Sequence, residues 1–235
     1  MTATNEVTRD AWLVARKQLL AREKQFTRER DALSAARRAL PRVRIDKPYL
    51  FAGPDGERTL VDLFAGKRQL AVYHFMFDPS WDEGCKSCSY VCDHLSGTVP
   101  HLAARDTALV VISRAPLAKL AAFKARMGWT FPWLSSWGSD FNYDFRVSFD
   151  PGDVAAQAVD YNYATQPFPV AEAQGMSVFL REDEAVFHTY STYGRGVDVL
   201  MGTYDILDLT PLGRQEEGLG FTMSWVRHHD RYPAR

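Results

Sequence analysis

The segment that most constrains the fold joins an apolar run to a pair of cysteines. Residues 71–77, AVYHFMF, are apolar and aromatic apart from one histidine, a pattern typical of a strand buried on both faces. Asp78 and Pro79 end the run, because proline has no N–H to donate in a central strand. Cys85 and Cys88 follow with C-x-x-C spacing, where the pattern loosens towards helical periodicity. A strand, a loop and a C-x-x-C at the start of a helix are typical of thiol–disulfide chemistry.

The two cysteines are expected to have different roles. A helix N-terminus presents unpaired N–H groups and the positive end of the helix dipole, and both favour a thiolate. In such places the cysteine pKa falls from about 8.5 to roughly 3.5–7.5. Cys85 at the helix tip is therefore the predicted attacking thiol, and Cys88, one turn inside, the resolving thiol. Cys92 shares a helical face with Cys88 and is either a second resolving thiol or, as we favour, a small buried hydrophobe.

Four further residues are candidates for supporting roles around the cysteine pair. His74 and Asp78 precede the cysteines, and either could transfer a proton during exchange, although His74 is more typical of a hydrogen-bonded core histidine. Arg114 follows a second apolar run and is expected at the same sheet edge as the cysteines. There it could stabilise a thiolate, hold an anionic substrate or form an ordinary surface salt bridge. Trp81 lies in the loop before the cysteines.

A metal site is an alternative use of the cysteines, because C-x-x-C begins many such sites. The candidate ligands are Cys85, Cys88, Cys92, His94 and His101. Structural zinc sites usually take a second pair of ligands from a distant hairpin, and the sequence has no second C-x-x-C and no H-x-x-x-H. We therefore expect no metal and no other cofactor.

Composition describes an ordinary globular chain. Its 235 residues suffice for one domain with additions or for two domains, and 46% hydrophobic with 24% charged residues is usual. The net charge of −1 gives no reason to expect nucleic acid or an anionic membrane as a partner. No apolar run approaches the ~18 residues of a membrane span, and the N-terminus lacks a signal-peptide core. Because the three cysteines are clustered rather than spread as a disulfide framework, we expect a cytoplasmic protein.

A long helix is predicted at the start of the chain, since residues 8–40 contain neither glycine nor proline. Apolar residues recur at every seventh position, at Trp12, Leu19, Phe26, Leu33 and Leu40. This narrow stripe on an Arg-rich helix either lies across its own domain or forms a dimerisation arm, and we expect a homodimer. The predicted divisions are an arm at 1–41, a main domain at 42–215 and a tail at 216–235. In the tail, His228 and His229 are expected to face solvent.

The main domain alternates strands and helices. Two short strands are expected at 49–51 and 59–61, with the central strand and the cysteine helix after them. A buried strand at 108–113, a helix at 116–127, a β-hairpin at 176–190 and a helix at 197–208 complete the prediction. These lengths favour parallel βαβ pairing. The aromatic insertion at about 129–170 is either a subsidiary core or the wall of a ligand pocket.

Several motifs together resemble a known family. They are the arm ending Arg37-Arg38-Ala39-Leu40-Pro41, Tyr73-His74-Phe75-Met76-Phe77, Gly84-Cys85-x-x-Cys88-Ser89, Ser113-Arg114-Ala115-Pro116, Met127-Gly128-Trp129, Ser139-Asp140-Phe141-Asn142-x-Asp144-Phe145, Phe187-His188-Thr189-Tyr190-Ser191 and Leu207-Asp208-Leu209-Thr210-Pro211. These segments are similar to the bacterial "domain of unknown function eight-nine-nine" family, which is described as thioredoxin-like and predicted to be a dithiol–disulfide oxidoreductase. The resemblance implies an α/β, thioredoxin-like or peroxiredoxin-like sheet flanked by helices. It also implies a thiol, disulfide or peroxide substrate with an unknown electron donor.

Three positions depart from better-known relatives of this fold. Lys86 and Ser87 fill the gap in which thioredoxins carry a proline, and Gly175 stands near the point where they have a cis-proline. Asp82 replaces the threonine that peroxiredoxins place three residues before the attacking cysteine. The leading hypothesis is thiol–disulfide or thiol-dependent peroxide reduction. The alternatives are a metal-binding redox sensor and a small-molecule-binding or non-catalytic protein of thioredoxin fold.

Overall fold

The computed structural model describes residues 5–233 and separates into two compact units, one ending at Pro41 and one beginning at Arg42. The first unit is the single helix α1 (Arg9–Arg38), as the sequence predicts. Its N-cap is Thr8, whose hydroxyl accepts a hydrogen bond from the N–H of Ala11 at 3.3 Å. Within residues 5–41 this unit is one helix, so the described part of it has no second element against which to bury the apolar stripe. No helix in residues 5–233 is both long and apolar enough to cross a membrane.

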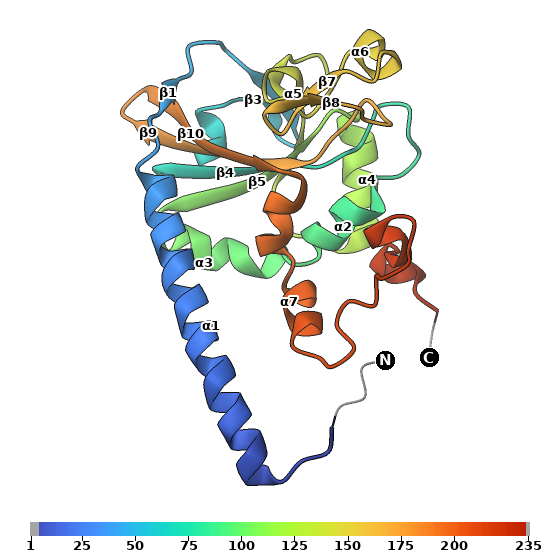
Figure 1. The fold of residues 1–235 in the computed structure, drawn as a ribbon. Helices are drawn as coiled ribbons and strands as arrows, with labels where there is room; N and C mark the ends of the chain where they lie inside the picture. Colours follow the sequence, from blue (N-terminus) through green and yellow to red (C-terminus); the bar gives the residue numbers. More distant parts are fainter. Residues whose placement is uncertain (1–4, 234–235) are drawn as a thin grey trace. The chain divides into compact units, whose positions relative to one another are not determined.

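The second unit is built around an eight-stranded sheet (Figure 1). Its strands are β1 (Val43–Arg44), β2 (Leu50–Gly53), β3 (Gly56–Thr59), β4 (Gln69–His74), β5 (Thr107–Ser113), β6 (Trp133–Ser135), β9 (Gly175–Glu182) and β10 (Ala185–Tyr193). Their order across the sheet is β1-β10-β9-β4-β5-β6-β2-β3. A separate ribbon pairs β7 (Val159–Tyr161) with β8 (Ala164–Gln166).

Four central strands identify the fold. The order β10-β9-β4-β5, with β4 parallel to β5 and antiparallel to β9, is the strand arrangement of a thioredoxin-like fold. A parallel pair needs a crossover connection, and here helices α2 (Lys86–Cys92) and α3 (Val99–Ala103) supply it. Helix α4 (Leu117–Met127) follows β5, and Gly128 ends it in the left-handed conformation. The predicted thioredoxin-like fold is therefore confirmed.

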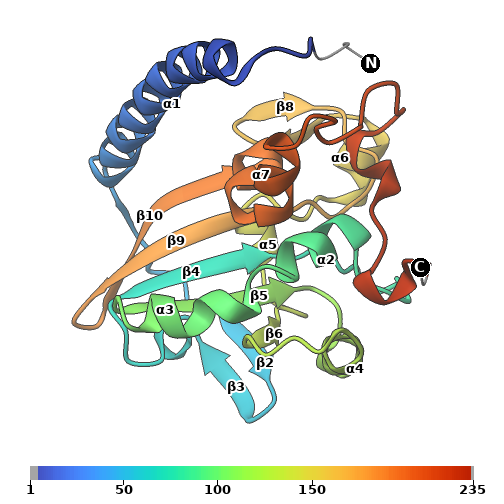
Figure 2. The same ribbon diagram turned by 90° about the horizontal axis from the view of Figure 1, so that it is seen from below.

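The remaining helices lie on two sides of the sheet. They are α5 (Phe141–Asp144), α6 (Pro151–Ala155) and α7 (Gly202–Asp208), with short 3-10 helices at Asp62–Phe64, Ser96–Thr98, Gly194–Leu200, Thr222–Trp225 and His229–Arg231. Figures 1 and 2 show α2, α3 and α7 on one face of the sheet, with α5 and the β7–β8 ribbon on the other. The sheet is thus covered on both faces, which is why β4 and β5 read as continuous apolar runs.

Two hydrophobic cores occupy the two faces, and the strands feed them alternately. On one face, Tyr73 and Val111 pack with Cys88 and Cys92 in what we call the α2 core. On the other face, the adjacent positions Leu70, Val72, Val110 and Ile112 pack with Phe141 and Phe145 of the α5 core. The side of β4 on which a residue lies therefore decides whether it can reach the cysteines.

The aromatic insertion belongs mostly to these cores. Trp129, Phe131 and Trp133 enter the α2 core, whereas Phe141 and Phe145 enter the α5 core. The segment also contributes β6, which pairs with β5 in the main sheet. The sequence analysis did not predict this strand, because three residues are too few to show an alternating pattern. Of the two interpretations of the segment, core packing is the one that the structure supports for these side chains.

The helix predicted at 197–208 is interrupted. A 3-10 helix, Gly194–Leu200, and helix α7, Gly202–Asp208, are separated by Met201, whose backbone is not helical (φ −110°, ψ 73°). Glycine weakens a helix interior, and glycines at 196 and 202 flank the interruption. The prediction of a single helix is therefore wrong for residues 197–201, whereas its second half corresponds to α7.

Candidate functional site

Cys85 is the N-cap residue of α2, as the spacing predicted. Its N–H donates to the carbonyl of Met76 at 3.1 Å, which ties the loop back to the chain leaving β4. Its own carbonyl accepts hydrogen bonds from the N–H and the hydroxyl of Ser89, each at 2.9 Å. These contacts fix the backbone of Cys85 at the start of the first turn of α2.

The surroundings of Cys85 favour its thiolate and lower its pKa to about 7. The largest contribution is a hydrogen bond from the Cys88 thiol, and burial opposes it. The N–H groups of Cys88 and Ser87 at the open end of the helix, together with the charge of Lys86, lower the pKa further. A substantial fraction of Cys85 is therefore the nucleophilic thiolate at neutral pH.

Cys88 and Cys92 are buried within α2, and all three cysteines are free thiols. Burial raises the pKa of Cys88 well above its usual value, and the neighbouring Cys85 raises it further. Burial likewise raises the pKa of Cys92, with a smaller contribution from Asp93. The helix thus carries one activated thiol at its tip and two protonated thiols inside the α2 core.

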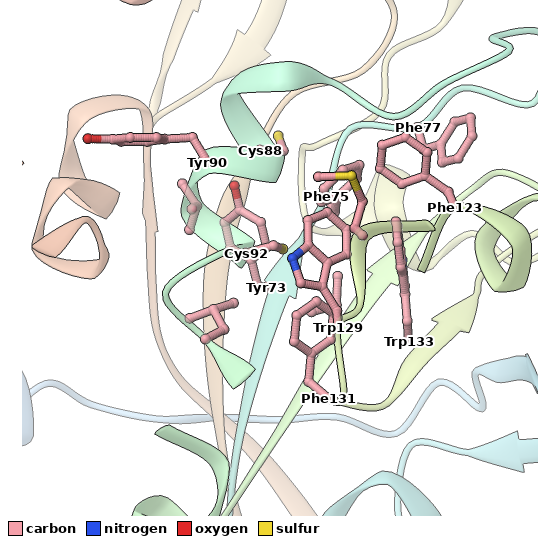
Figure 3. Packing of buried hydrophobic residues seen from close by; sticks show 14 of the residues in the cluster. Tyr73, Phe75, Phe77, Cys88, Tyr90, Cys92, Phe123, Trp129, Phe131 and Trp133 are labelled. Atoms are coloured by element: carbon pink, nitrogen blue, oxygen red, sulfur yellow. The ribbon is translucent and has the colours of Figure 1, made fainter. Parts of the chain in front are cut away.

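Tyr73 is a neighbour of the cysteines that the sequence analysis missed. It lies on β4, is fully buried, and its hydroxyl interacts with the Cys88 thiol (Figure 3). Burial, together with the nearby cysteines, raises the pKa of Tyr73 well above its usual value, so the hydroxyl keeps its proton. Strand alternation gave part of the signal, because it places residues 71 and 73 on the same face of β4, but the face that α2 covers is known only from the structure.

His74 lies on the opposite face of β4 from the cysteines. Its Nε2 is 2.8 Å from the hydroxyl of Ser177, and its ring stacks on Phe145 in the α5 core. Burial lowers its pKa to about 3, with a smaller effect from His188, so the ring is neutral. The suggestion that His74 transfers protons to the thiols is not supported, because adjacent strand residues point to opposite faces. It is instead the core histidine of the alternative interpretation.

Arg114 is held in a polar cluster rather than beside the thiol. Its Nη2 donates to Asp78 at 3.1 Å, its Nε to Glu172 at 2.7 Å, and its Nη1 to the hydroxyl of Tyr143. It is not among the largest influences on the pKa of Cys85. The structure therefore shows an ion pair for Arg114, and a largely buried one rather than the surface salt bridge considered from the sequence.

Asp78 is one anionic partner in this cluster. Burial opposes its ionisation, but hydrogen bonds from Ser80 and the charge of Arg114 outweigh burial and lower the pKa of Asp78. The carboxylate is thus committed to Ser80 and Arg114. Trp81, the remaining supporting candidate, packs at the edge of the α2 core, and its carbonyl accepts a hydrogen bond from Lys119 at 2.8 Å.

The C-terminal segment is bonded to the residues on both sides of Cys85. Nε2 of His228 is 2.9 Å from the carbonyl oxygen of Gly84, and Nζ of Lys86 donates to the carbonyl of Ser224 at 3.0 Å. The expectation that His228 faces solvent is wrong, because Val226 enters the α2 core and carries His228 inside with it. His229 is exposed, with Nδ1 2.7 Å from a carboxylate oxygen of Asp93.

Comparison with known families identifies the family to which the chain belongs. Residues 1–232 match the family model described as "Bacterial protein of unknown function (DUF899)". The chain is a member of this family. No curated protein matches it.

Solved structures give matches at low sequence identity. Peroxidoxin BcpB from Mycobacterium tuberculosis matches with 14% identity and a TM-score of 0.45, over 70% of this DUF899 chain and 95% of that chain. A cysteine-to-serine mutant of PrxQ from Xylella fastidiosa has 13% identity and a TM-score of 0.42, over 68% and 89%. A candidate protein disulfide isomerase from Bacteroides thetaiotaomicron has 18% identity and a TM-score of 0.40, over 72% and 94%.

The candidate metal ligands of this DUF899 chain do not converge. Among residues 5–233, no group of three or more His, Cys, Asp or Glu side chains is arranged to hold a metal ion. The ring nitrogens of His94 are taken by the carbonyl of Tyr90 at 2.7 Å and the hydroxyl of Thr203 at 2.8 Å. His101 is exposed on α3.

Proposed function

We propose that this protein is a dithiol oxidoreductase in which Cys85 attacks an oxidised substrate and Cys88 resolves the product. The observation that carries the proposal is the pairing of the two thiols. Cys85 is the N-cap of α2, and Cys88 lies one turn inside the same helix, buried in the α2 core. The Cys88 thiol is the main cause of the lowered pKa of Cys85. An activated thiolate with a protonated partner in reach is the arrangement that exchange requires.

The reaction proceeds in two displacements. The Cys85 thiolate attacks one sulfur of a substrate disulfide, forms a mixed disulfide and expels the other sulfur as a thiolate. Cys88, after losing its proton, attacks the Cys85 sulfur and expels the second substrate thiolate. Two electrons pass from the cysteine pair to the substrate, which leaves as two thiols once protonated.

A hydroperoxide can replace the disulfide in the first step. Attack of the Cys85 thiolate on the terminal oxygen cleaves the O–O bond and gives a sulfenic acid and an alcohol. Attack by Cys88 on that sulfur then releases water. Both routes end in a Cys85–Cys88 disulfide, so a thiol reductant must return the pair to the reduced state. A reducing cytoplasm, the compartment expected from the sequence, supplies such donors.

Disulfide mapping tests the assignment. Oxidation of the reduced protein with diamide should give a Cys85–Cys88 link in peptide maps. Cys85→Ser should abolish reaction with substrate, and Cys88→Ser should accumulate the mixed disulfide. Cys92→Ser is the matched control, a third helix cysteine whose loss should leave the link intact. A dominant Cys88–Cys92 link would contradict the assigned roles.

Alkylation tests the activation of Cys85 separately. Iodoacetamide labelling, read site by site by mass spectrometry, should show half-maximal reactivity of Cys85 near pH 7. Cys88 and Cys92 should label much more slowly, because they are buried and protonated. If Cys85 titrates near the ordinary value of about 8.5, the non-catalytic or ligand-binding alternatives replace the enzyme proposal.

A further inference from the structure

The second displacement raises a difficulty at Cys88. Cys88 is 1% exposed, and only a thiolate can attack the mixed disulfide. Burial is the largest cause that keeps Cys88 protonated, and the presence of Cys85 adds to it. Once Cys85 is bound in a mixed disulfide it no longer carries a negative charge, so its contribution disappears. Burial remains, and something in the α2 core must offset it.

We propose that Tyr73 donates a hydrogen bond to the Cys88 sulfur as that sulfur becomes a thiolate, and so enables Cys88 to resolve the mixed disulfide. The inference rests on the proposed function and adds a residue to its second step. Tyr73 contributes no charge and accepts no proton. The proton of Cys88 leaves with solvent or with the departing substrate thiolate, and the electron count of the two displacements is unchanged.

The Tyr73 side chain is placed for this role. It is fully buried on the face of β4 that α2 covers, within the same core as Cys88 (Figure 3). Within residues 5–233 its hydroxyl has no hydrogen-bond partner of ordinary geometry, although it interacts with the Cys88 thiol. A buried hydroxyl without a partner costs free energy. A thiolate forming beside it would supply the missing acceptor.

The other groups around Cys88 leave this role to Tyr73. The N–H of Met76 also favours the Cys88 thiolate, but as a fixed backbone group. Tyr161 is also within electrostatic range of Cys88, but its hydroxyl already donates to the carbonyl of Gln174 at 2.8 Å. Tyr73 therefore has an uncommitted donor close to the resolving sulfur.

Two-phase thiol release tests the proposal without the natural substrate. Dithiodipyridine releases one thiopyridone when Cys85 attacks and a second when Cys88 resolves. Tyr73→Phe should leave the first phase unchanged and slow the second by about three- to tenfold at pH 7. The estimate assumes that losing a hydrogen bond to a charged group raises the Cys88 pKa by roughly one to two units. A thiolate of higher pKa is also a stronger nucleophile, which offsets about half of the resulting loss in the logarithm of the rate.

The pH profile separates this role from a structural one. The deficit of Tyr73→Phe should shrink as pH rises, because Cys88 then ionises without help. Tyr90→Phe is the matched control, since it removes another unpartnered buried hydroxyl from the same core. An equal slowing at every pH, or no slowing, would overturn the proposal. A wild-type protein without a second phase would instead refute the proposed function.

A second measurement is independent of turnover. Ultraviolet titration of the Cys88 thiolate in a Cys85→Ser background should give a pKa roughly one to two units higher when Tyr73→Phe is added. Tyr73→Phe keeps the ring and deletes an unsatisfied hydroxyl, so the variant is expected to fold. An unchanged Cys88 pKa would count against the hydrogen bond even if the kinetics were altered.

Discussion

Glu172 is a single carboxyl whose protonation is coupled to folding. Its side chain is 1% exposed, and it accepts hydrogen bonds from Arg114 at 2.7 Å and from the hydroxyl of Ser148 at 2.9 Å. Burial outweighs the charge of Arg114 and raises the pKa of Glu172 from 4.5 to about 7. The folded chain thus binds this proton more tightly than the unfolded chain does. The resulting stabilisation is fully present below pH 4.5 and is lost as pH rises through about 7.

The first prediction follows from the raised pKa of Glu172, which makes the folded chain less stable as pH rises. Between about pH 5 and pH 7.5 the wild type should lose roughly 2 kcal/mol of unfolding free energy through this group, and Glu172→Gln should flatten the loss. Urea unfolding across this range measures it. Glu182→Gln, which removes an exposed carboxylate paired with Arg42, is the control and should keep the slope. If Glu172→Gln leaves the slope unchanged, another group is responsible.

Helix α2 and the C-terminal segment are bonded to each other around Cys85. The segment reaches the helix by way of His228 on Gly84 and Ser224 on Lys86. Farther out, Arg126 bridges Glu83 at 2.8 Å and Asp230 at 2.7 Å. The position of Cys85 is therefore maintained by residues about 140 positions later in the chain.

The second prediction concerns this attachment. His228→Ala should leave the Gly84 carbonyl without its partner and lower the unfolding free energy by about 1–3 kcal/mol. Loosening the segment should also accelerate alkylation of Cys85 at fixed pH. His229→Ala is the matched control, because His229 is exposed and its loss should change neither quantity by much. Equal effects of the two variants would mean that the contact to Gly84 contributes no more to stability or to the protection of Cys85 than an exposed histidine does.

The elements that the sequence predicted are those with a local cause. Proline after the apolar run, glycine after α4 and the two-residue connection of the β9–β10 hairpin each act within a few residues. The cysteine pair and the start of α2 were accessible for the same reason. Tyr73, by contrast, was hidden until the face of β4 covered by α2 was known. The burial of His228 depends on a contact with Gly84, which no local pattern encodes.

At the scale of the whole molecule, the feature that matters most is the apolar stripe of helix α1. This helix forms a compact unit of its own, and its stripe of Trp12, Leu19, Phe26 and Leu33 has no second helix in the described part of that unit. An apolar row of this length is costly in water. We expect a second copy of the chain to supply the partner, as the heptad spacing indicates.

Light scattering tests this third prediction. The full-length chain should have the mass of a dimer, and the pair of substitutions Leu19→Glu and Phe26→Glu should give a monomer with unchanged secondary structure. Lys17→Glu and Lys24→Glu form the control pair, because these exposed residues follow Trp12 and Leu19 by five positions and lie on the side of α1 away from the stripe. A full-length chain that is monomeric at micromolar concentration would refute the expected homodimer.

The distribution of tryptophan gives the α2 core an optical property. Trp129 and Trp133 lie inside this core with ring centroids 5.6 Å apart, and Trp81 and Trp225 pack against its edge. Indole emission is quenched to different extents by a neighbouring thiol and a neighbouring disulfide. Four of the six tryptophans therefore belong to the core that contains Cys88 and Cys92 or pack against it. Oxidation of the cysteine pair should change the indole emission, which would report the redox state in real time and without any label attached to the protein.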